Sequence, residues 1–368
     1  MKVSNIFQQG PHRSLLGHHD VHRHRPLVNK ILCQSCTQHY QTAVGETTGA
    51  KTIKGSSRHP HGMDYLNLIS AFPQQLADAK KICRDIRLKQ KPGAIIICGM
   101  GSSGTVGDII HNLDCSAPLA VNKTDHLPAF VDQSTLVFLI SYTGNTPEII
   151  RCGEHAIKRK ARAVAITSGG QLLRFAQQHN IPSFTLPAGH FPHWSISHLL
   201  LPVLTILANN QLINTTVEDI EIAITMLSKA QVKDRAEALA HNIGSKTPLI
   251  YAGHQLSSAA WHIKESFNRI ARQQAFANVF PEISHAEIHA LPRNSHIILL
   301  RDQTDSPIVE QGMNTLKEEA KAKKIDITEL MLRGERPLNK ILLAIFFGEH
   351  VSFYCAQRSG TLIEKTAQ

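Results

Sequence analysis

Three short polar segments, each directly after an apolar run, contain the residues best suited to bind an anion: Gly99–Gly104, Ser141–Thr146 and Thr167–Gly170. In the second segment, the hydroxyls of Ser141, Thr143 and Thr146 gather beside backbone N–H groups where a helix is predicted to begin. A helix N-terminus carries about half a positive charge, and its free N–H groups can hold a phosphate without a metal. This segment is therefore a candidate phosphate site.

The second segment alone could be an ordinary helix cap, and the other two segments favour a phosphate site instead. Ser102 and Ser103 add hydroxyls in the first segment, and Ser168 adds one in the third. Three such loops favour a phosphate site over simple capping. The first segment also fits the G-x-G-x-x-G pattern of dinucleotide sites, but the later stretch 121–123 lacks the acidic residue that such a site needs.

Apolar runs and helical patterns alternate around these segments. Strands are predicted at Ala94–Cys98, Thr135–Ile140, Arg162–Ile166 and Ile181–Leu186. Successive strand–turn–helix units are typical of a doubly wound parallel α/β sheet. Because ligands bind at the carboxyl ends of the strands in such sheets, all three polar segments are expected at one edge.

The second half of the chain repeats this pattern more weakly. Strands are predicted at Pro248–Gly253, His296–Leu300 and Ile325–Thr328, with helices at Leu256–Phe276, Pro307–Lys323 and Leu338–Gln357. A chain of 368 residues is long enough for two domains. We therefore predict a first domain over 63–230 and a second over 231–368, each a parallel sheet flanked by helices.

Residues 1–62 differ from the rest. They hold eight lysines and arginines against only Asp20 and Glu46, and eight of the 22 histidines. Apolar periodicity is absent, so this segment is predicted to be a disordered extension. Cys33, Cys36 and His39 lack a fourth ligand at recognisable spacing, so no metal site is expected. No helix-turn-helix pattern accompanies the basic charge, so nucleic acid is not an expected partner.

Cysteine usage and hydropathy bear on the location of the protein. The seven cysteines are odd in number and scattered, which favours reduced thiols in the cytoplasm. The longest apolar stretch, Ile196–Ala208, includes Ser197, His198 and Pro202. It is too short to span a bilayer, so we expect a buried helix and no membrane partner.

With these motifs in place, the sequence resembles the sugar isomerase (SIS) fold. More narrowly, it resembles the bifunctional phosphoglucose/phosphomannose isomerase family over about residues 63–365. The resemblance rests on the three polar segments and on Phe280–Glu287, approached by the helix around His262–Glu265. The Ser141–Thr146 loop is common to SIS proteins, whereas the segment that ends at Glu287 is specific to this isomerase family. The resemblance implies two SIS domains in tandem.

The resemblance also implies an activity, the interconversion of fructose 6-phosphate with glucose 6-phosphate or mannose 6-phosphate, with no cofactor. Glu287 occupies the position of the family's catalytic base. That base moves a proton between neighbouring carbons of the sugar through a cis-enediolate. The implied phosphate ligands are Ser102, Ser103, Ser141, Thr143 and Thr146. Gly101 and Thr361 are implied to face the sugar, and Lys365 to stand for the family's lysine.

Several positions depart from the family pattern. His193 stands where the family has an arginine that steadies the enediolate, and Ser306 stands where it has the ring-opening histidine. His285 and His289 are candidates to replace that histidine. Two hypotheses follow: an active isomerase, or a sugar-phosphate-binding SIS protein with weak or no turnover. We also expect a homodimer, because the terminal helix around Ile341–Phe347 is apolar on more than one face.

Overall fold

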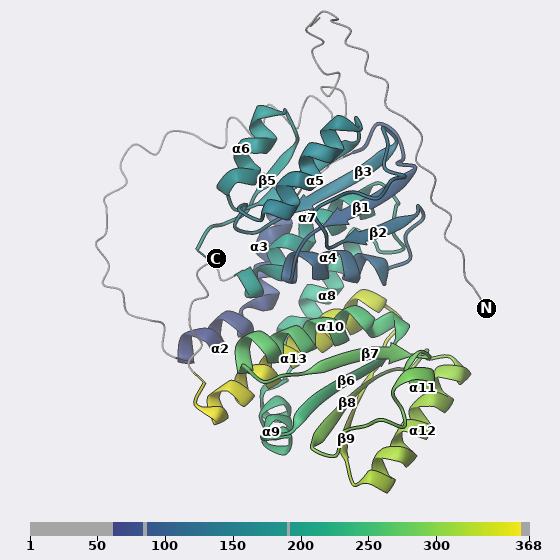
Figure 1. Ribbon diagram of the computed structural model, residues 1–368. Coiled ribbons are helices and arrows are strands. Elements are labelled where there is room, and N and C mark those ends of the chain that lie inside the picture. Colours follow the sequence, from purple (N-terminus) through teal and green to yellow (C-terminus); the bar gives the residue numbers. More distant parts are fainter. Residues whose placement is uncertain (1–61, 84–86, 190–191, 362–368) are drawn as a thin grey trace, which may run out of the picture.

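The computed structural model describes residues 62–83, 87–189 and 192–361 (Figure 1). The predicted extension over 1–62 lies, except for Gly62, outside the described residues, and so does Lys365. Within the described ranges, no helix is both long and apolar enough to cross a membrane.

The first half forms a parallel sheet of five strands in the order β2-β1-β3-β4-β5. The strands are β1 (Ala94–Cys98), β2 (Leu119–Asn122), β3 (Thr135–Ile140), β4 (Arg162–Thr167) and β5 (Ser183–Thr185). The predicted strands are confirmed, but β2 was not predicted. It is a four-residue edge strand whose first three residues are only half-buried, so it lacks the continuous apolar run of a central strand.

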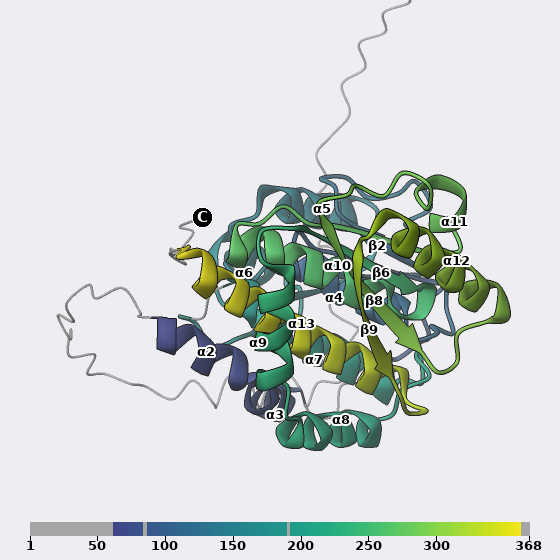
Figure 2. The same ribbon diagram turned by 90° about the horizontal axis from the view of Figure 1, so that it is seen from below.

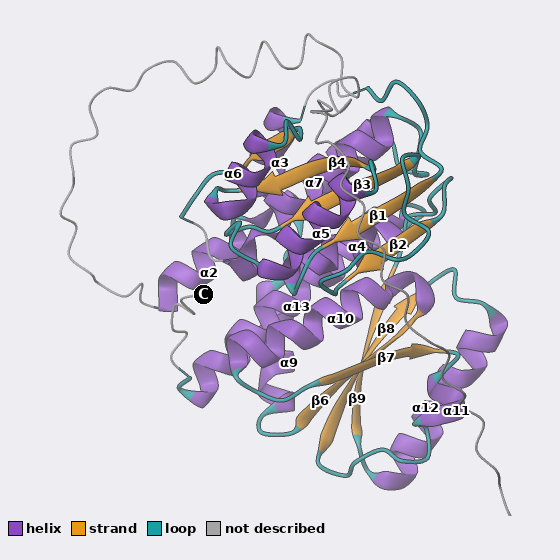
Figure 3. Ribbon diagram, turned by 45° about the horizontal axis from the view of Figure 1, so that its top comes forward, coloured by secondary structure: helices purple, strands orange, loops and turns teal. Residues whose placement is uncertain are grey.

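Helices cover both faces of this sheet (Figures 1 and 3). α4 (Ser102–His111) and α7 (Ile196–Asn209) pack on one face, and α5 (Pro147–Lys158) and α6 (Gly170–Gln178) on the other. All six residues of β3 are buried, as expected for a central strand between two helical layers. The doubly wound architecture predicted for this half is confirmed.

The second half forms a parallel sheet in the order β7-β6-β8-β9. The strands are β6 (Thr247–Gly253), β7 (Phe276–Phe280), β8 (Ser295–Asp302) and β9 (Asp326–Leu332). The helix predicted over 256–276 is wrong in its second half. A short turn, η2 (His254–Leu256), leads into α10 (Ser257–Ser266), which ends in a single π-helical turn, η3 (Phe267–Ala271), and the chain then enters β7.

Local interactions explain why the helix stops. Arg272 adopts a left-handed conformation with φ of 52°, which a helix cannot continue through. The Asn268 Oδ1 atom accepts a hydrogen bond from the backbone N–H of Ala275 at 2.9 Å and so fixes the return of the chain. Apolar periodicity alone cannot distinguish this helix-to-strand transition from a longer helix.

The two sheets share one large apolar core, made mostly by helices that lie between and beside them (Figures 1 and 2). These helices are α2 (Gly62–Ser70), α3 (Phe72–Ile82), α7, α8 (Val217–Lys229), α9 (Lys233–Ile243), α10 and α13 (Pro337–Ser359). The rings of Phe72 and Phe346 stack with centroids 6.0 Å apart, which joins the two ends of the described chain. The apolar surface of α13 over Ile341–Phe347 is thus buried inside the chain and does not form an exposed dimer face.

The remaining helices of the second half, α11 (Ile283–Ala286) and α12 (Pro307–Lys323), cover the outer face of its sheet. A smaller apolar cluster around Phe280 and Met313 fills the space beneath them. These helices lie on the side of that sheet away from α10 and α13 (Figure 1).

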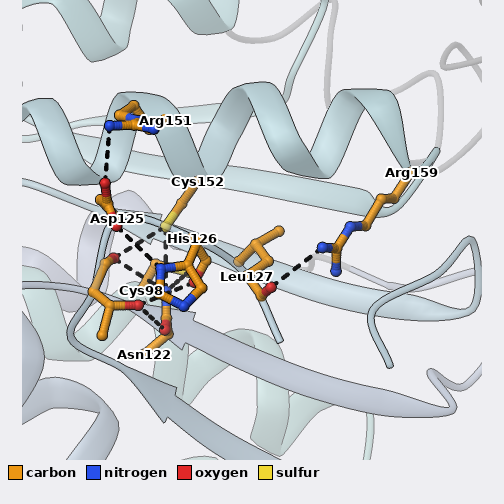
Figure 4. A network of polar contacts seen from close by, with 9 residues as sticks. Cys98, Asn122, Asp125, His126, Leu127, Arg151, Cys152 and Arg159 are labelled. Atoms are coloured by element: carbon orange, nitrogen blue, oxygen red, sulfur yellow. Dashed lines mark hydrogen bonds and ion pairs between the residues drawn. The ribbon is translucent and has the colours of Figure 1, made fainter. Parts of the chain in front are cut away.

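The order of the first sheet determines where a ligand can enter. All strands run parallel, but the strand order reverses between β1 and β3: β2 lies on one side of β1, and β3, β4 and β5 follow on the other. The connections after β1 and β3 therefore diverge and leave a crevice at their carboxyl ends. Beneath this point the Asn122 amide donates to the thiols of Cys98 at 3.7 Å and Cys152 at 3.2 Å (Figure 4). These contacts tie β1, β2 and α5 together directly under the two loops.

Candidate active site

A cavity of about 410 Å³ opens at the carboxyl ends of β1 and β3. It is lined by Met100, Gly101, Ser102, Ser103, Ser141, Tyr142, Thr143, Asn145, Thr146, Pro147, Glu148, Pro192 and Arg269. The five predicted phosphate ligands and Gly101 are all among these residues. The structure therefore brings together the first two polar segments, which are about 40 residues apart in sequence.

The Ser141–Thr146 loop is ordered by its own hydroxyls. The Ser141 and Thr146 hydroxyls are 2.8 Å apart, and the backbone N–H of Gly144 donates to Ser141 Oγ at 3.1 Å. Thr146 occupies the N-cap position of α5, with Pro147 as the first helical residue. The cap hydroxyl bonds to Ser141 and not to the helix, and Pro147 has no N–H, so the backbone N–H of Glu148 is the first-turn donor left for a bound anion.

The third polar segment supports this loop and does not line the cavity. The Ser168 hydroxyl donates to the carbonyl of Tyr142 at 2.6 Å. At Gly144, φ is +69°, and an added Cβ would lie 1.9 Å from the carbonyl oxygen of Gly169. Only glycine allows the two loops to approach this closely. Ser168 thus braces the Ser141–Thr146 loop, whereas the sequence had suggested a third group facing the ligand.

The first segment contributes the beginning of α4. Ser102 and Ser103 lie in the first turn of that helix, and Gly101 precedes it with φ of +52°. The Ser102 hydroxyl lies 3.3 Å from His193 Nδ1. Two helix N-termini, those of α4 and α5, therefore face the same cavity, and their partial positive charges add.

His193 lies beneath the cavity and is not part of its lining. Its Nε2 atom lies 3.2 Å from the Ser266 hydroxyl, so both ring nitrogens have serine partners. Burial, assisted by nearby His262 and Arg269, lowers the pKa of His193 well below its usual value. The imidazole is therefore neutral near pH 7. It cannot supply the positive charge that the resemblance implies for this position.

His193 also belongs to a buried polar cluster with His262 and Glu349. Their possible ligand atoms lie within 4.8 Å of one another. His262 Nε2 is 2.9 Å from Glu349 Oε1, and the His193 and His262 rings are parallel with centroids 5.3 Å apart. The contact with His262 accounts for the buried carboxylate of Glu349, because a buried charge needs a partner.

The predicted base, Glu287, lies in the second half of the chain. It directly follows α11 and is half-buried. Tyr251 donates to its Oε2 atom at 2.8 Å, and Asn278 donates to its Oε1 atom at 2.7 Å. The carboxylate is thus held by β6 and β7 and is not among the residues that line the cavity.

The other predicted residues of this half also lie away from the cavity lining. His285 is exposed on α11. The Thr361 hydroxyl lies 2.6 Å from that of Ser359, just beyond the end of α13. Lys365 lies outside the described residues. Within the described chain, the first half supplies the loops Met100–Ser103 and Ser141–Glu148 with Pro192, and the second half supplies only Arg269 to the cavity.

Arg269 is the site residue that sequence reasoning missed. It lies in η3, the π-helical turn after α10, and its side chain reaches the α4 loop: an added Cβ on Gly101 would lie 3.5 Å from its Nη1 atom. Residues 101 and 269 come together only because α10 packs against α4. No local motif marked this arginine, so only the tertiary arrangement reveals it.

Comparisons with known proteins agree with this description. Residues 232–365 match the family model of the bacterial phospho-glucose isomerase C-terminal SIS domain. A bifunctional phosphoglucose/phosphomannose isomerase of Thermoplasma acidophilum is 31% identical over 274 residues, which is 72% of this chain and 83% of that protein. Its counterpart in Caldicellulosiruptor bescii is 29% identical, over 77% of this chain and 91% of the relative.

A solved structure extends the comparison of folds. The C-terminal domain of glucosamine-fructose-6-phosphate aminotransferase from Francisella tularensis superposes with a TM-score of 0.66. The match covers 84% of this chain and 99% of that domain at 15% identity. The described chain therefore has the fold of the SIS sugar isomerases.

Proposed function

The chain belongs to the bifunctional phosphoglucose/phosphomannose isomerase family and is thus an isomerase by family, and we propose that it interconverts fructose 6-phosphate with glucose 6-phosphate or mannose 6-phosphate. The observation that carries the proposal is the cavity at the ends of β1 and β3, lined by Ser141, Thr143 and Thr146. In this proposal the loop holds the phosphate, and the open-chain sugar extends from it.

The physical case for phosphate binding is the local electrostatics. The N-termini of α4 and α5 both face the cavity, and the backbone N–H groups of Ser102 and Glu148 there have no helical partner. A sugar phosphate carries a charge of about −1.5 to −2 near neutral pH, which this partial positive charge stabilises. Ser102 and Ser103 add hydroxyls on the α4 side.

The proposed reaction needs a base that removes the proton from the carbon next to the carbonyl. In this proposal Glu287 accepts that proton, the electron pair forms a cis-enediolate, and the same carboxyl returns the proton to the neighbouring carbon. Tyr251 and Asn278 orient the carboxylate by donating one hydrogen bond to each oxygen. General base catalysis of this kind contributes about 10²–10⁴ in rate.

A second candidate function is sugar-phosphate binding with weak or no turnover. Two observations favour it: Glu287 does not line the cavity, and the second half contributes a guanidinium to the lining. Arginine stays protonated in proteins and cannot act as a base at neutral pH. In this alternative the phosphate loop is retained and the proton transfer is lost.

An isomerase assay with fructose 6-phosphate distinguishes the two functions. Glucose 6-phosphate and mannose 6-phosphate are detected separately for the wild type, Glu287→Gln and, as a control, Glu318→Gln, which alters an exposed glutamate of α12. Turnover that is lost only in Glu287→Gln supports the isomerase and its base. Equal turnover in all three contradicts the role of Glu287. No turnover, with a sugar phosphate still raising the melting temperature, supports the second function.

We also propose that the protein is a homodimer. Because α13 is buried in the core, the interface of the proposed dimer lies on other elements. Trp261 on α10 and Phe276 on β7 are 38% and 49% exposed, and these two elements pack against each other. Large exposed apolar side chains on neighbouring elements are typical of an interface. Sedimentation of a monomer alone at micromolar concentration contradicts this proposal.

A further inference from the structure

We propose that Cys98 and Cys152 form a site of reversible oxidation, at which a hydroperoxide converts the two thiols into a disulfide that joins β1 to α5. Neither cysteine lines the cavity, so the oxidation does not depend on what the cavity binds. The effect of the disulfide on ligand binding rests on the proposed function, because glucose 6-phosphate is the ligand that reports it.

The two thiols come together from separate elements (Figure 4). Cys98 is the last residue of β1, and Cys152 lies on the buried face of α5. Asn122, the register partner of Cys98 on β2, donates to Cys98 Sγ at 3.7 Å and to Cys152 Sγ at 3.2 Å. The two thiols also hydrogen-bond to each other. Because the sulfurs are already in contact, a disulfide of about 2.05 Å requires side-chain rotation and a small shift of α5 toward β1.

The two sulfurs differ in reactivity. Burial raises the pKa of Cys83 and Cys355 to about 12, which keeps these thiols inert. The pKa of Cys152 is instead lowered, because the Cys98 thiol and the Asn122 amide donate to its sulfur. The same thiol contact, together with burial, raises the pKa of Cys98. Since the thiolate is the reacting form, Cys152 is the attacking sulfur and Cys98 the resolving one.

A thin layer of exposed chain covers Cys152. Its thiol donates to the carbonyl of Thr124 at 3.3 Å, and Thr124 is itself exposed. The ion pair between Arg151 and Asp125, 2.9 Å apart, holds this cover against α5 (Figure 4). Exposed ion pairs contribute little to stability. Brief opening of the segment 123–126 therefore admits a molecule as small as hydrogen peroxide.

The reaction balances with the hydroperoxide as oxidant. The Cys152 thiolate attacks one oxygen of hydrogen peroxide, the O–O bond breaks, and a sulfenic acid and hydroxide form. The hydroxide takes up the proton that the Cys152 thiol released and becomes water. The Cys98 sulfur then attacks the sulfenic sulfur, the S–S bond forms, and a second water leaves. Two electrons pass from the two sulfurs to the peroxide, and dithiothreitol returns them by thiol–disulfide exchange.

The disulfide acts on the cavity through the two elements that it joins. Cys98 directly precedes the Gly99–Gly104 segment, and Cys152 lies on the helix whose N-terminus faces the cavity. A shift of α5 toward β1 displaces the Ser141–Thr146 loop, and a displacement of about 1 Å can cost about 100-fold in rate. We expect the oxidised protein to bind glucose 6-phosphate about tenfold or more weakly than the reduced protein.

Treatment of the full chain with hydrogen peroxide, followed by peptide mass mapping, tests the site. In the wild type, the peptides that contain Cys98 and Cys152 should appear joined, and dithiothreitol should release them. Cys152→Ser should leave the Cys98 thiol free. Cys355→Ser is the matched control and should oxidise like the wild type, because Cys355 is also buried but its pKa is raised. Calorimetric titration of the reduced and oxidised wild type with glucose 6-phosphate then measures the effect on the cavity.

The other outcomes are distinct. If the two peptides stay separate, or if either cysteine joins a different one, the proposed site is wrong. A Cys98–Cys152 disulfide that changes the dissociation constant of glucose 6-phosphate by less than about twofold contradicts the effect on the cavity. If the reduced protein binds no sugar phosphate, the proposed function fails, while a mapped Cys98–Cys152 disulfide still supports the oxidation site.

Discussion

Substitution of Gly144 tests how the Ser141–Thr146 loop is held in place. In Gly144→Ala, the new Cβ would lie 1.9 Å from the carbonyl oxygen of Gly169 and 2.7 Å from the hydroxyl of Thr167. Relief of this overlap requires the two loops to separate by more than about 1 Å, because carbon and oxygen atoms make contact at about 3.5 Å. That movement weakens the 2.8 Å hydrogen bond from the N–H of Leu172 to the carbonyl of Gly144.

The chain provides a matched control for the backbone strain. Gly360 has φ of +67°, against +69° at Gly144, but an added Cβ there meets no atom within 4 Å. Gly360→Ala should cost only the strain of a left-handed alanine, about 1–2 kcal/mol. Gly144→Ala carries that strain and in addition the overlap, which costs about 1–3 kcal/mol more.

Urea unfolding of the two variants measures the difference, and titration with glucose 6-phosphate measures its effect on the site. We expect Gly144→Ala to unfold at lower urea than Gly360→Ala. It should also raise the dissociation constant at least about tenfold, since small displacements of positioned groups have large effects. Equal unfolding midpoints, or unchanged binding by Gly144→Ala, would refute this account of the loop.

Three further predictions concern the framework of the site. Lys340→Met should lower the free energy of unfolding by about 3–5 kcal/mol, because it leaves the buried carboxylate of Asp302 without its counter-charge, which lies 2.7 Å away at Lys340 Nζ. Urea unfolding measures this loss, and the double variant with Asp302→Asn should recover part of it. His193 binds a proton more weakly when folded, so its contribution should lower the stability as the pH drops below about 6.5, by at most about 1.4 kcal/mol per pH unit, in addition to the same effect from His296 and His350. His193→Asn should reduce that slope, and an unchanged slope contradicts the assignment. Asn122→Leu should cost about 1–3 kcal/mol in thermal or urea unfolding, because it removes the donor that bridges Cys98 and Cys152.

Much of the fold follows from local sequence patterns. The buried runs Ala94–Cys98 and Thr135–Ile140 form the central strands as predicted, because residues covered on both faces must be apolar throughout. The edge strand β2 and the strand β7 were missed. The first is short and half-exposed, and the second follows a helix whose apolar pattern runs on into it.

The candidate site divides in the same way. Its polar loops depend on short-range chemistry: hydroxyls and glycines that follow a strand and precede a helix are visible in the sequence as one motif. The rest of the lining depends on contacts between residues more than 150 positions apart, such as Gly101 and Arg269. No spacing rule covers such pairs.

The sequence by itself thus determined the parallel α/β architecture, the polar loop at the end of β3 and the family resemblance, because each depends on patterns within a few residues. Only the tertiary structure decided the rest. The packing of α10 against α4 brings Arg269 into the cavity, burial makes His193 neutral, and Tyr251 with Asn278 fixes Glu287 away from the described lining. These are properties of the environment of each side chain, which depends on segments distant in the chain.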